Sequence, residues 1–278
     1  MALPCSKNEA NRLGKRLAAE APLTAKDEDL LEEILSAYFE AQKIAQDRLA
    51  RLGLQATGRV KETPTLKEKL RKQSTMQLLS LDDVAGVRMV LHGGRKAQDR
   101  AVAAILMEFN SELAKKPIDR RATPSHGYRA VHVIVRLGEL KVEIQVRTQL
   151  QDLWAQVIET LGTKWGRELR YGEPLKGART PFWPGAEETR EGLFGVCLGL
   201  SDSIARHEVL WLKCANMRDE LGALRWSPIW LWPPVMVLNV SLRYRLLRLE
   251  RQGRRDTVML REILTQLNHL VKQLEGAT

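Results

Sequence analysis

Two adjacent stretches of alternating residues constrain the fold more strongly than any other feature of this chain. The first has valine at every second position of residues 131–135, and the second reads KVEIQVR over residues 141–147. Alternate side chains of a β-strand point to opposite faces, so each stretch predicts a strand with one apolar face. The Leu-Gly-Glu joint at residues 137–139 is short enough for a hairpin. The pattern therefore predicts two paired strands that contribute to a core.

The other face of the second strand raises a question of function. It carries Glu143, Gln145 and Arg147, which are an acid, an amide and a guanidinium. Half-buried antiparallel strands commonly turn such a face to water, and the strand by itself favours that interpretation. The alternative is a face that lines a binding site, and the remaining residues decide between the two.

The rest of the chain predicts helices around these strands. Residues 24–27 resemble a capping box, and Thr63-Pro64 supplies an N-cap followed by proline at the first helical position. Residues 86–91, GVRMVL, read as a further buried strand. Helices are predicted over residues 8–19, 26–51, 63–73, 96–110, 149–161, 190–222 and 243–275.

This order of elements predicts an α+β fold with a small mixed β-sheet flanked by helices and with helical N- and C-terminal extensions. We expect the N-terminal helices in residues 1–55 and the sheet-containing core in residues 56–171. A linker rich in Gly and Pro is expected over residues 172–189, before a helical C-terminal region at residues 190–278.

The composition indicates a globular protein with an affinity for anions. The 278 residues are 44% apolar and 28% charged, which excludes wholesale disorder. The formal net charge of +10 favours a polyanionic partner such as nucleotide phosphates or nucleic acid. Arginine-rich codon usage would give the same charge without any function.

Cysteine usage and hydropathy predict a cytoplasmic protein without a membrane partner. Cys5, Cys197 and Cys214 form no CxxC pair, so neither a disulfide framework nor a zinc site is indicated. The N-terminal residues lack the apolar region of a secretory signal. The most apolar window, residues 228–240, contains three prolines and has about half the length of a bilayer span. We expect this window to be buried or covered by a partner protein, with interfacial membrane contact as the alternative.

The polar residues around the predicted sheet are those that phosphoryl transfer needs. If the hairpin strands pair, His132 and Glu143 can share the polar face, and Asp83 adds a second carboxylate suited to Mg²⁺. Lysine and arginine side chains that could bind several phosphates lie before and within the predicted strand at residues 86–91. Tyr128 offers a ring on which a base could stack. The chain contains no GxxxxGK[ST] segment, so side chains and not a P-loop would hold the phosphates.

Five blocks of these residues, in order, resemble the synthetase domain of the RelA/SpoT family of nucleotide pyrophosphokinases. The resemblance extends over roughly residues 58–165, and the pairing of HGYRAVH with VEIQVRT is its most specific part. The flanking NRLGKRL and LSDSIARHE segments are similar to those of single-domain members. The blocks are GRVK (58–61), KEKLRK (67–72), DDVAGVRMV (82–90), HGYRAVH (126–132) and VEIQVRT (142–148).

The resemblance implies transfer of the β,γ-pyrophosphate of ATP, with Mg²⁺, to the 3′-hydroxyl of GDP or GTP, giving (p)ppGpp. It implies that Asp83 and Glu143 are catalytic and hold the metal, and that Glu143 is the base for the acceptor hydroxyl. It implies a guanine platform at Tyr128. The implied ATP-binding residues are Arg59 and Arg88, stacked on adenine, and Lys61 and Lys69, on the phosphates. The implied positioning residues for acceptor and phosphates are His132, Gln145 and Arg147.

Two departures from the family pattern concern the acceptor. His126 stands where the family often has asparagine, and the loop at residues 119–125 lacks the family's lysines, for which Arg120 and Arg121 could substitute. A toxin-like enzyme of the same fold that modifies the 3′ CCA end of tRNA therefore remains an alternative, as does an adenine nucleotide acceptor. A catalytically inactive module that binds nucleotide or RNA is the third hypothesis. Helices after the core also predict a homo-oligomer.

Overall fold

The computed structural model describes the backbone of residues 2–19, 22–72, 77–166, 179–183, 186–224 and 233–273. Side chains are described in the same ranges except at residues 179–189, 223–224 and 233–239. The chain divides into two compact units, which are described separately below. The first unit comprises Met1–Val90, Asp99–Asp119 and Val131–Arg147, and the second comprises Leu91–Gln98, Arg120–Ala130 and Thr148–Thr278.

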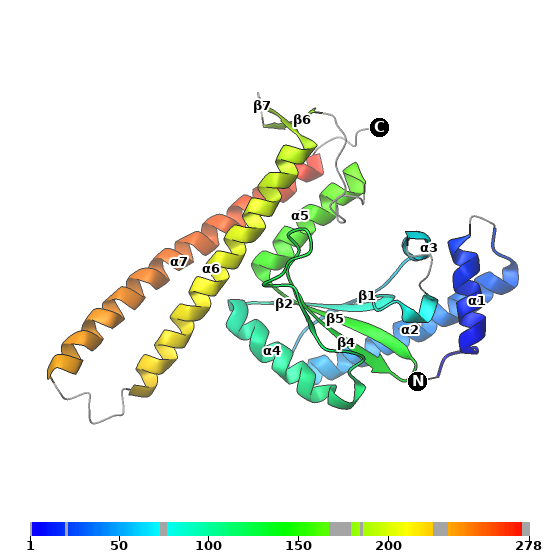
Figure 1. The fold of residues 1–278 in the computed structure, drawn as a ribbon, viewed down its shortest axis with the longest axis horizontal. Helices are drawn as coiled ribbons and strands as arrows, with labels where there is room; N and C mark the ends of the chain where they lie inside the picture. The colour runs from blue at the N-terminus through cyan, green and yellow to red at the C-terminus, as the bar shows by residue number, and fades with distance from the viewer. Residues whose placement is uncertain are drawn as a thin grey trace. The chain divides into compact units, whose positions relative to one another are not determined.

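The predicted helices and the predicted strands β2, β4 and β5 occur in the expected order, and the structure adds the short strands β1, β3, β6 and β7, which were not predicted (Figure 1). The strands are β1 (Thr57–Val60), β2 (Ala85–Leu91), β3 (Ile118–Asp119), β4 (Val131–Leu137), β5 (Leu140–Thr148), β6 (Arg179–Trp183) and β7 (Ala186–Thr189). The α-helices are α1 (Lys7–Ala18), α2 (Ala25–Arg51), α3 (Thr63–Lys72), α4 (Gly94–Glu108), α5 (Gln149–Trp165), α6 (Arg190–Leu224) and α7 (Pro233–Gln273). Short 3₁₀ turns lie at Leu78–Ser80 and Asn110–Glu112.

A five-stranded mixed sheet in the order β1-β2-β5-β4-β3 forms the centre of the first unit, so the predicted α+β class is confirmed. The predicted hairpin is present, because β4 and β5 pair antiparallel with Val133 opposite Ile144. Both of these side chains are fully buried. The turn between the strands contains Gly138 at φ 67°, a conformation in which glycine avoids the strain that other residues meet.

Local capping explains why the helices begin where they do. The Thr24 hydroxyl accepts a hydrogen bond from the Asp27 backbone N–H at 3.3 Å, and the Asp27 carboxylate accepts one from the Thr24 N–H at 3.4 Å. This is the capping box that the sequence predicts at the start of α2. Thr148 and Gln151 form a second box that ends β5 and begins α5.

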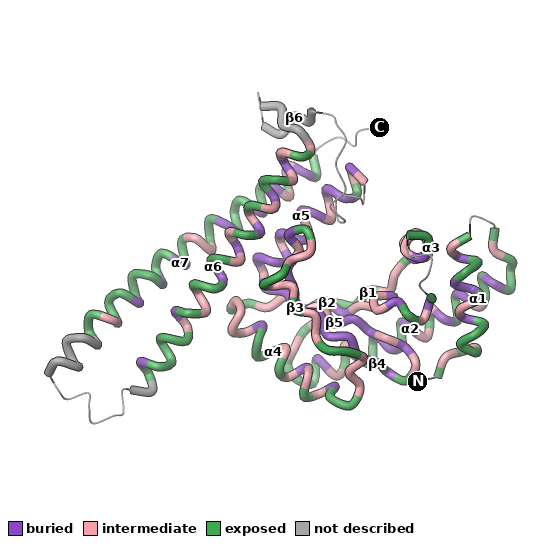
Figure 2. The backbone as a smooth tube through the Cα atoms, viewed as in Figure 1, coloured by how far each residue is buried: buried purple, intermediate pink, exposed green. Residues whose placement is uncertain are grey.

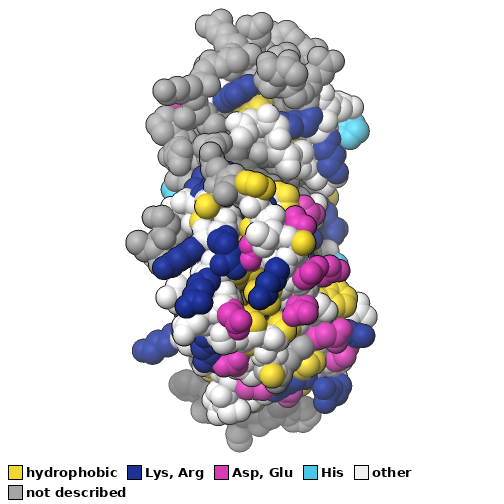
Figure 3. Space-filling view, turned by 90° about the vertical axis from the view of Figure 1, so that its right-hand side faces the viewer, with side chains coloured by type: hydrophobic (Ala, Val, Ile, Leu, Met, Phe, Trp, Pro, Cys, Tyr) yellow, Lys and Arg dark blue, Asp and Glu magenta, His cyan; other side chains and the backbone are white. Residues whose placement is uncertain are grey.

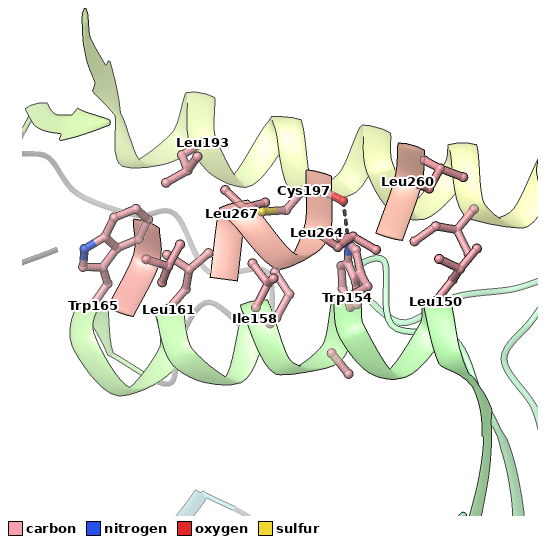
Figure 4. Close-up of a cluster of buried hydrophobic side chains, with 14 residues drawn as sticks. Leu150, Trp154, Ile158, Leu161, Trp165, Leu193, Cys197, Leu260, Leu264 and Leu267 are labelled. Atoms are coloured by element: carbon pink, nitrogen blue, oxygen red, sulfur yellow. Dashed lines mark hydrogen bonds between the residues drawn. The ribbon is translucent and has the colours of Figure 1, made fainter. Parts of the chain in front are cut away.

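The second unit is built on α5, α6 and α7, which pack along one another around an apolar core (Figure 4). Trp154 on α5 is 2% exposed and donates its indole N–H to the Cys197 carbonyl of α6 at 2.6 Å. The core is contributed by buried leucines and other apolar residues from all three helices, including Leu150, Leu161, Leu193, Leu260, Leu264 and Leu267.

Two C-terminal segments differ in detail from the prediction. Helix α7 begins at Pro233, ten residues before the predicted start at residue 243, because proline is favourable in the first turn, where its missing N–H costs no hydrogen bond. The apolar window at residues 228–240 therefore runs into α7, and its first five residues lie outside the described residues. The second half of the expected linker holds the β6–β7 hairpin. The proposed domain boundaries themselves remain predictions.

Within the described part of the chain, no helix has both the length and the apolar character needed to cross a membrane. The three cysteines are free thiols.

Candidate active site

The polar face of β5 is buried, which excludes the simple solvent-exposed interpretation of its pattern. Glu143 is 8% exposed and Arg147 is 4% exposed, while Gln145 between them is partly buried. Burying a charged group is costly unless it is hydrogen-bonded and paired. These three side chains therefore require partners, and the first unit supplies several of them.

A line of hydrogen bonds connects the polar face of β5 to β4. The Glu143 Oε1 atom lies 2.7 Å from His132 Nδ1, so the two residues share one face as predicted. Gln145 donates from Nε2 to Glu143 Oε2 at 2.6 Å, and its own Oε1 accepts from Arg147 Nη2 at 2.9 Å. Both carboxylate oxygens of Glu143 are thus fixed in direction by neighbours on the same sheet.

These contacts decide the charge on Glu143. Its burial would raise the pKa of the carboxyl group, but the hydrogen bond and charge of His132, together with the Gln145 amide, hold that pKa below its usual value. Asp83 acts in the opposite direction, since its negative charge raises the pKa of Glu143. Glu143 is therefore an ionised, buried carboxylate within electrostatic range of a second one.

That second carboxylate is held by two lysines. Asp83 precedes β2, and its Oδ2 atom accepts from Lys61 Nζ at 2.9 Å and from Lys69 Nζ at 2.6 Å. Burial would raise the pKa of Asp83, but the two lysine charges hold it below the usual value. The second oxygen of Asp83, Oδ1, is buried without a hydrogen-bond partner. An orphaned carboxylate oxygen of this kind fits a place where a cation would bind.

The neighbouring Asp82 is directed to different partners. Its carboxylate binds Lys141 at 2.9 Å and also pairs with Lys115. Lys141 additionally donates to the Ser80 carbonyl at 2.9 Å, so this cluster fixes the turn before β2 to the start of β5. Asp82 is accordingly a structural residue, and Asp83 alone of the pair contributes to the cluster that contains Lys61 and Lys69.

Arg59 and Arg88 share one face of the β1–β2 pair. Thr57 lies opposite Arg88 and Arg59 lies opposite Gly86, which makes the two arginines diagonal neighbours in the antiparallel register. Diagonal neighbours stand about 7–8 Å apart, a spacing that leaves room for one flat ring between two guanidinium planes. Arg59 is exposed and Arg88 is partly buried.

The remaining predicted residues belong to the second unit. Tyr128 is half-buried and packs against the apolar core of α5, α6 and α7. The Arg120 backbone N–H donates to the Ala130 carbonyl at 3.0 Å, and Arg121 Nη1 lies 3.4 Å from Gln98 Oε1. The acceptor-binding roles of Arg120, Arg121 and Tyr128 remain predictions.

Backbone conformation explains the residue pair before Tyr128. His126 adopts φ 49° and Gly127 φ 81°, so both lie in the left-handed region. Asparagine and histidine are among the few residues that tolerate this region, which accounts for a histidine where the resemblance leads one to expect asparagine. A Cβ atom on Gly127 would lie 2.7 Å from the Trp154 ring, so that position also requires glycine for space.

One important residue was not singled out from the sequence. Arg129 is 7% exposed and binds Ser201 Oγ at 3.0 Å, Asp202 Oδ1 at 2.6 Å and the Arg121 carbonyl. It fastens the segment that carries Tyr128 to α6. The available signal was the LSD triplet at residues 200–202, which the sequence offered only as part of a resemblance.

Comparisons with known proteins identify the family of this chain. Residues 58–164 match the model of the region found in RelA / SpoT proteins. Uncharacterized proteins of Mycobacterium tuberculosis and Mycobacterium bovis are 34% identical over 221 residues, which cover 77% of this chain and 78% of theirs. The chain belongs to the RelA/SpoT family. The matched region of this RelA/SpoT protein includes Lys61, Lys69, Asp83 and Glu143.

Solved structures share the fold of this RelA/SpoT protein. The small alarmone synthetase 1 of Bacillus subtilis aligns with a TM-score of 0.50 and 21% identity, over 70% of this chain and 99% of that one. The same synthetase bound to its product pppGpp aligns with a TM-score of 0.52 and 19% identity, with the same coverage. At sequence identities of 19–21% these alignments show a shared fold and no more.

Proposed function

We propose that this protein is a pyrophosphokinase that transfers the β,γ-pyrophosphate of ATP to the 3′-hydroxyl of GDP or GTP, producing (p)ppGpp. The observation that carries the proposal is that two carboxylates with lowered pKa values, Glu143 and Asp83, lie within electrostatic range of each other in one unit. Glu143 is held by His132 and Gln145, and Asp83 is held by two lysines. Membership of the RelA/SpoT family supports it, as does the shared fold of a synthetase whose product is pppGpp.

Glu143 is the residue that would receive the acceptor proton. Its lowered pKa keeps it ionised at neutral pH, and its hydrogen bonds fix its orientation. A carboxylate with a lowered pKa is a weak base, but phosphoryl transfer through a loose transition state needs little proton transfer before the bond to the leaving group is broken. Glu143 would therefore orient the 3′-hydroxyl and accept its proton late in the step.

The donor side would be formed by Lys61, Lys69 and the two arginines. Both lysine ammonium groups now neutralise Asp83, and the same charges can neutralise phosphate oxygens as negative charge moves onto the leaving group. The diagonal placement of Arg59 and Arg88 suits planar stacking on the two faces of adenine. His132, Gln145 and Arg147 would position the acceptor and phosphates.

Asp83 and Glu143 are the residues that would hold Mg²⁺. The orphaned Oδ1 of Asp83 fits this role, and the charge of Asp83 acts on Glu143. Among the described residues no group of three or more His, Cys, Asp or Glu side chains could hold a metal ion. Two carboxylates are enough, because Mg²⁺ usually completes its shell with water and substrate phosphates. When bound, the ion would neutralise charge on the transferred group.

The test is transfer of label from γ-³²P-ATP in the presence of Mg²⁺, with GDP, GTP, ATP and deacylated tRNA offered as separate acceptors. Label in a guanosine polyphosphate is the expected result. Label in tRNA alone would replace the proposal with the toxin-like alternative. Label in none of the four acceptors, with ATP still bound, would indicate an inactive regulatory module. The Glu143→Gln protein is the matched control, since it keeps the shape of the side chain.

The proposed partners are therefore ATP and a guanine nucleotide. Lys and Arg side chains stand beside Asp and Glu side chains on the face seen in Figure 3, so that face has no field of a single sign. A mixed face of this kind suits a small nucleotide at least as well as a long polyanion.

The cytoplasmic location and a homo-oligomeric state are part of the same proposal, and sedimentation at micromolar concentration tests the oligomeric state.

A further inference from the structure

Helix α7 carries an unusual concentration of arginine on its exposed side. Residues 243–255 contain six arginines and a single acidic residue, Glu250. Glu250 is 5% exposed and pairs with Arg218 of α6, so its charge is already partnered. Figure 2 shows this part of α7 as largely exposed. The six exposed arginines are Arg243, Arg245, Arg248, Arg251, Arg254 and Arg255, here called the α7 arginine face.

Apolar side chains are interleaved with these arginines. Tyr244 is 64% exposed, Leu247 54% and Val258 63%. At 3.6 residues per turn they fall on the same side of the helix as Arg251 and Arg254. The Arg248 guanidinium lies over the Tyr244 ring, 5.9 Å from its centroid. Planar groups that can stack and cations that can bind phosphate thus alternate over one surface.

A hollow lies within this surface. It has a volume of about 390 Å³ and is lined by Leu247, Glu250, Arg251, Arg254 and Arg255. Three guanidinium groups therefore border it, and its one carboxylate is already paired with Arg218. Arginine forks match phosphate oxygens in a bidentate geometry, which makes the hollow suited to a phosphate group.

We propose that the α7 arginine face binds an unpaired strand of nucleic acid, with phosphates between the arginines and bases against Tyr244 and Leu247. Arg248, Arg251 and Arg255 follow one another at intervals of three and four residues, which is about 4.5–6 Å along the helix axis. A row of cations at this interval follows a phosphate backbone. Aromatic and apolar groups beside such a row are typical of sites for single strands, whose bases are free to stack.

The arrangement fits a membrane surface less well. An interfacial helix separates a continuous apolar face from its charged face. Here exposed apolar side chains such as Tyr244, Leu247 and Val258 stand among the arginines. The face is also distinct from the carboxylate cluster around Glu143, which lies in the first unit.

The test is fluorescence anisotropy of a labelled oligouridylate of about 12 nucleotides with the full chain, without ATP or Mg²⁺, over a series of KCl concentrations. The triple variant Arg248→Gln, Arg251→Gln, Arg255→Gln should lower the affinity at least ten-fold at low salt. It should also reduce the slope of log affinity against log salt by about 2, because each lost phosphate contact removes about 0.7 on a single strand.

The matched control removes three exposed lysines of the first unit, in the variant Lys15→Gln, Lys43→Gln, Lys116→Gln. It loses the same charge and should retain most of the affinity. Equal weakening by both triple variants would overturn the proposal, because binding would then follow net charge alone. Thermal unfolding of each variant checks that its fold is intact.

The contribution of stacking is tested separately. Tyr244→Ala should weaken binding about ten-fold with little change in salt slope, and Tyr244→Phe should restore it. Deoxyribose and ribose oligomers of one sequence show whether the 2′-hydroxyl adds affinity, and binding of either supports the proposal. Tighter binding of a duplex, or binding of anionic phospholipid vesicles with none of the oligonucleotides, would refute it.

Discussion

His132 Nδ1 and Glu143 Oε1 lie 2.7 Å apart although Gln145, and not Glu143, is the residue paired with His132 in the β4–β5 register. The two side chains therefore meet along a diagonal of the sheet, the second kind of cross-strand contact that antiparallel strands allow. Because both are about 8% exposed, their bond forms out of contact with bulk water. This contact lowers the pKa of the residue that we propose as the base.

Replacing Glu143 by glutamine should abolish transfer while leaving the fold intact. The amide keeps the size of the side chain but cannot accept the hydroxyl proton, so we expect kcat to fall about 10²–10⁴-fold. ATP affinity, measured by equilibrium binding, should stay within about three-fold, since in the proposal the donor is held by Lys61, Lys69 and the arginines. A variant with unchanged kcat would remove Glu143 from the reaction.

Loss of His132 should change the pH dependence. His132 is the chief group that lowers the pKa of Glu143, while burial and the charge of Asp83 raise it. In His132→Leu the pKa of Glu143 should therefore rise, and the acidic limb of the kcat profile should move to higher pH. His92→Leu, at an exposed histidine of the second unit, is the control and should leave the profile in place.

The same pKa has a consequence for stability. A carboxyl group whose folded pKa is lowered contributes stability that is present above its unfolded pKa and is lost as pH falls through the folded value. Wild-type protein should accordingly lose free energy of unfolding below about pH 4, and His132→Leu should lose less of it there. Urea unfolding at a series of pH values measures the difference.

The adjacent aspartates offer a matched pair of variants. Asp83→Asn leaves Lys61 and Lys69 without their carboxylate and removes the proposed metal ligand, so we expect loss of transfer and about 1–3 kcal/mol of stability. Asp82→Asn makes the same change in charge one residue away, where the partners are Lys115 and Lys141. It should lower the melting temperature but keep most of the activity. The reverse outcome would exchange the roles assigned to the two residues.

Replacing Arg59 or Arg88 by lysine should weaken ATP binding, although the positive charge is kept. Arg88→Lys and Arg59→Lys keep the positive charge but lose the flat guanidinium that we propose stacks on adenine. KM for ATP should rise about ten-fold or more in each, a loss of the order expected for a stacked cation. Lys67→Arg, on the nearby α3, should have no such effect. If the lysine variants bind ATP normally, adenine is held elsewhere.

The turn before Tyr128 should tolerate asparagine at position 126 but not alanine at position 127. Gly127→Ala would combine a strained φ of 81° with a Cβ only 2.7 Å from the Trp154 ring, and we expect a loss of 1–3 kcal/mol or more. His126→Asn keeps a residue suited to φ 49° and should leave the melting temperature nearly unchanged or slightly higher. Thermal unfolding of the two single variants decides the point.

The sequence by itself determined the helices and the strands β2, β4 and β5, because the signals for them are local, whereas the short strands β1, β3, β6 and β7 were not predicted. The alternation in β4 and β5 depends only on the two-residue repeat of a strand, and the Thr24–Asp27 capping box on four consecutive residues. The candidate residues of the first unit were also readable, since their types and order follow the RelA/SpoT pattern. What the pattern could not provide was the partner of each side chain.

Only the tertiary structure decided those partners. Asp82 and Asp83 are chemically identical neighbours, yet one binds Lys141 and the other Lys61 and Lys69. The polar side chains of β5 look equally suited to water, yet Glu143 is buried against His132. Successive residues at a strand boundary point in different directions, and the burial of a face depends on what the rest of the chain brings against it. Both are set by contacts between residues far apart in the sequence, which no local pattern contains.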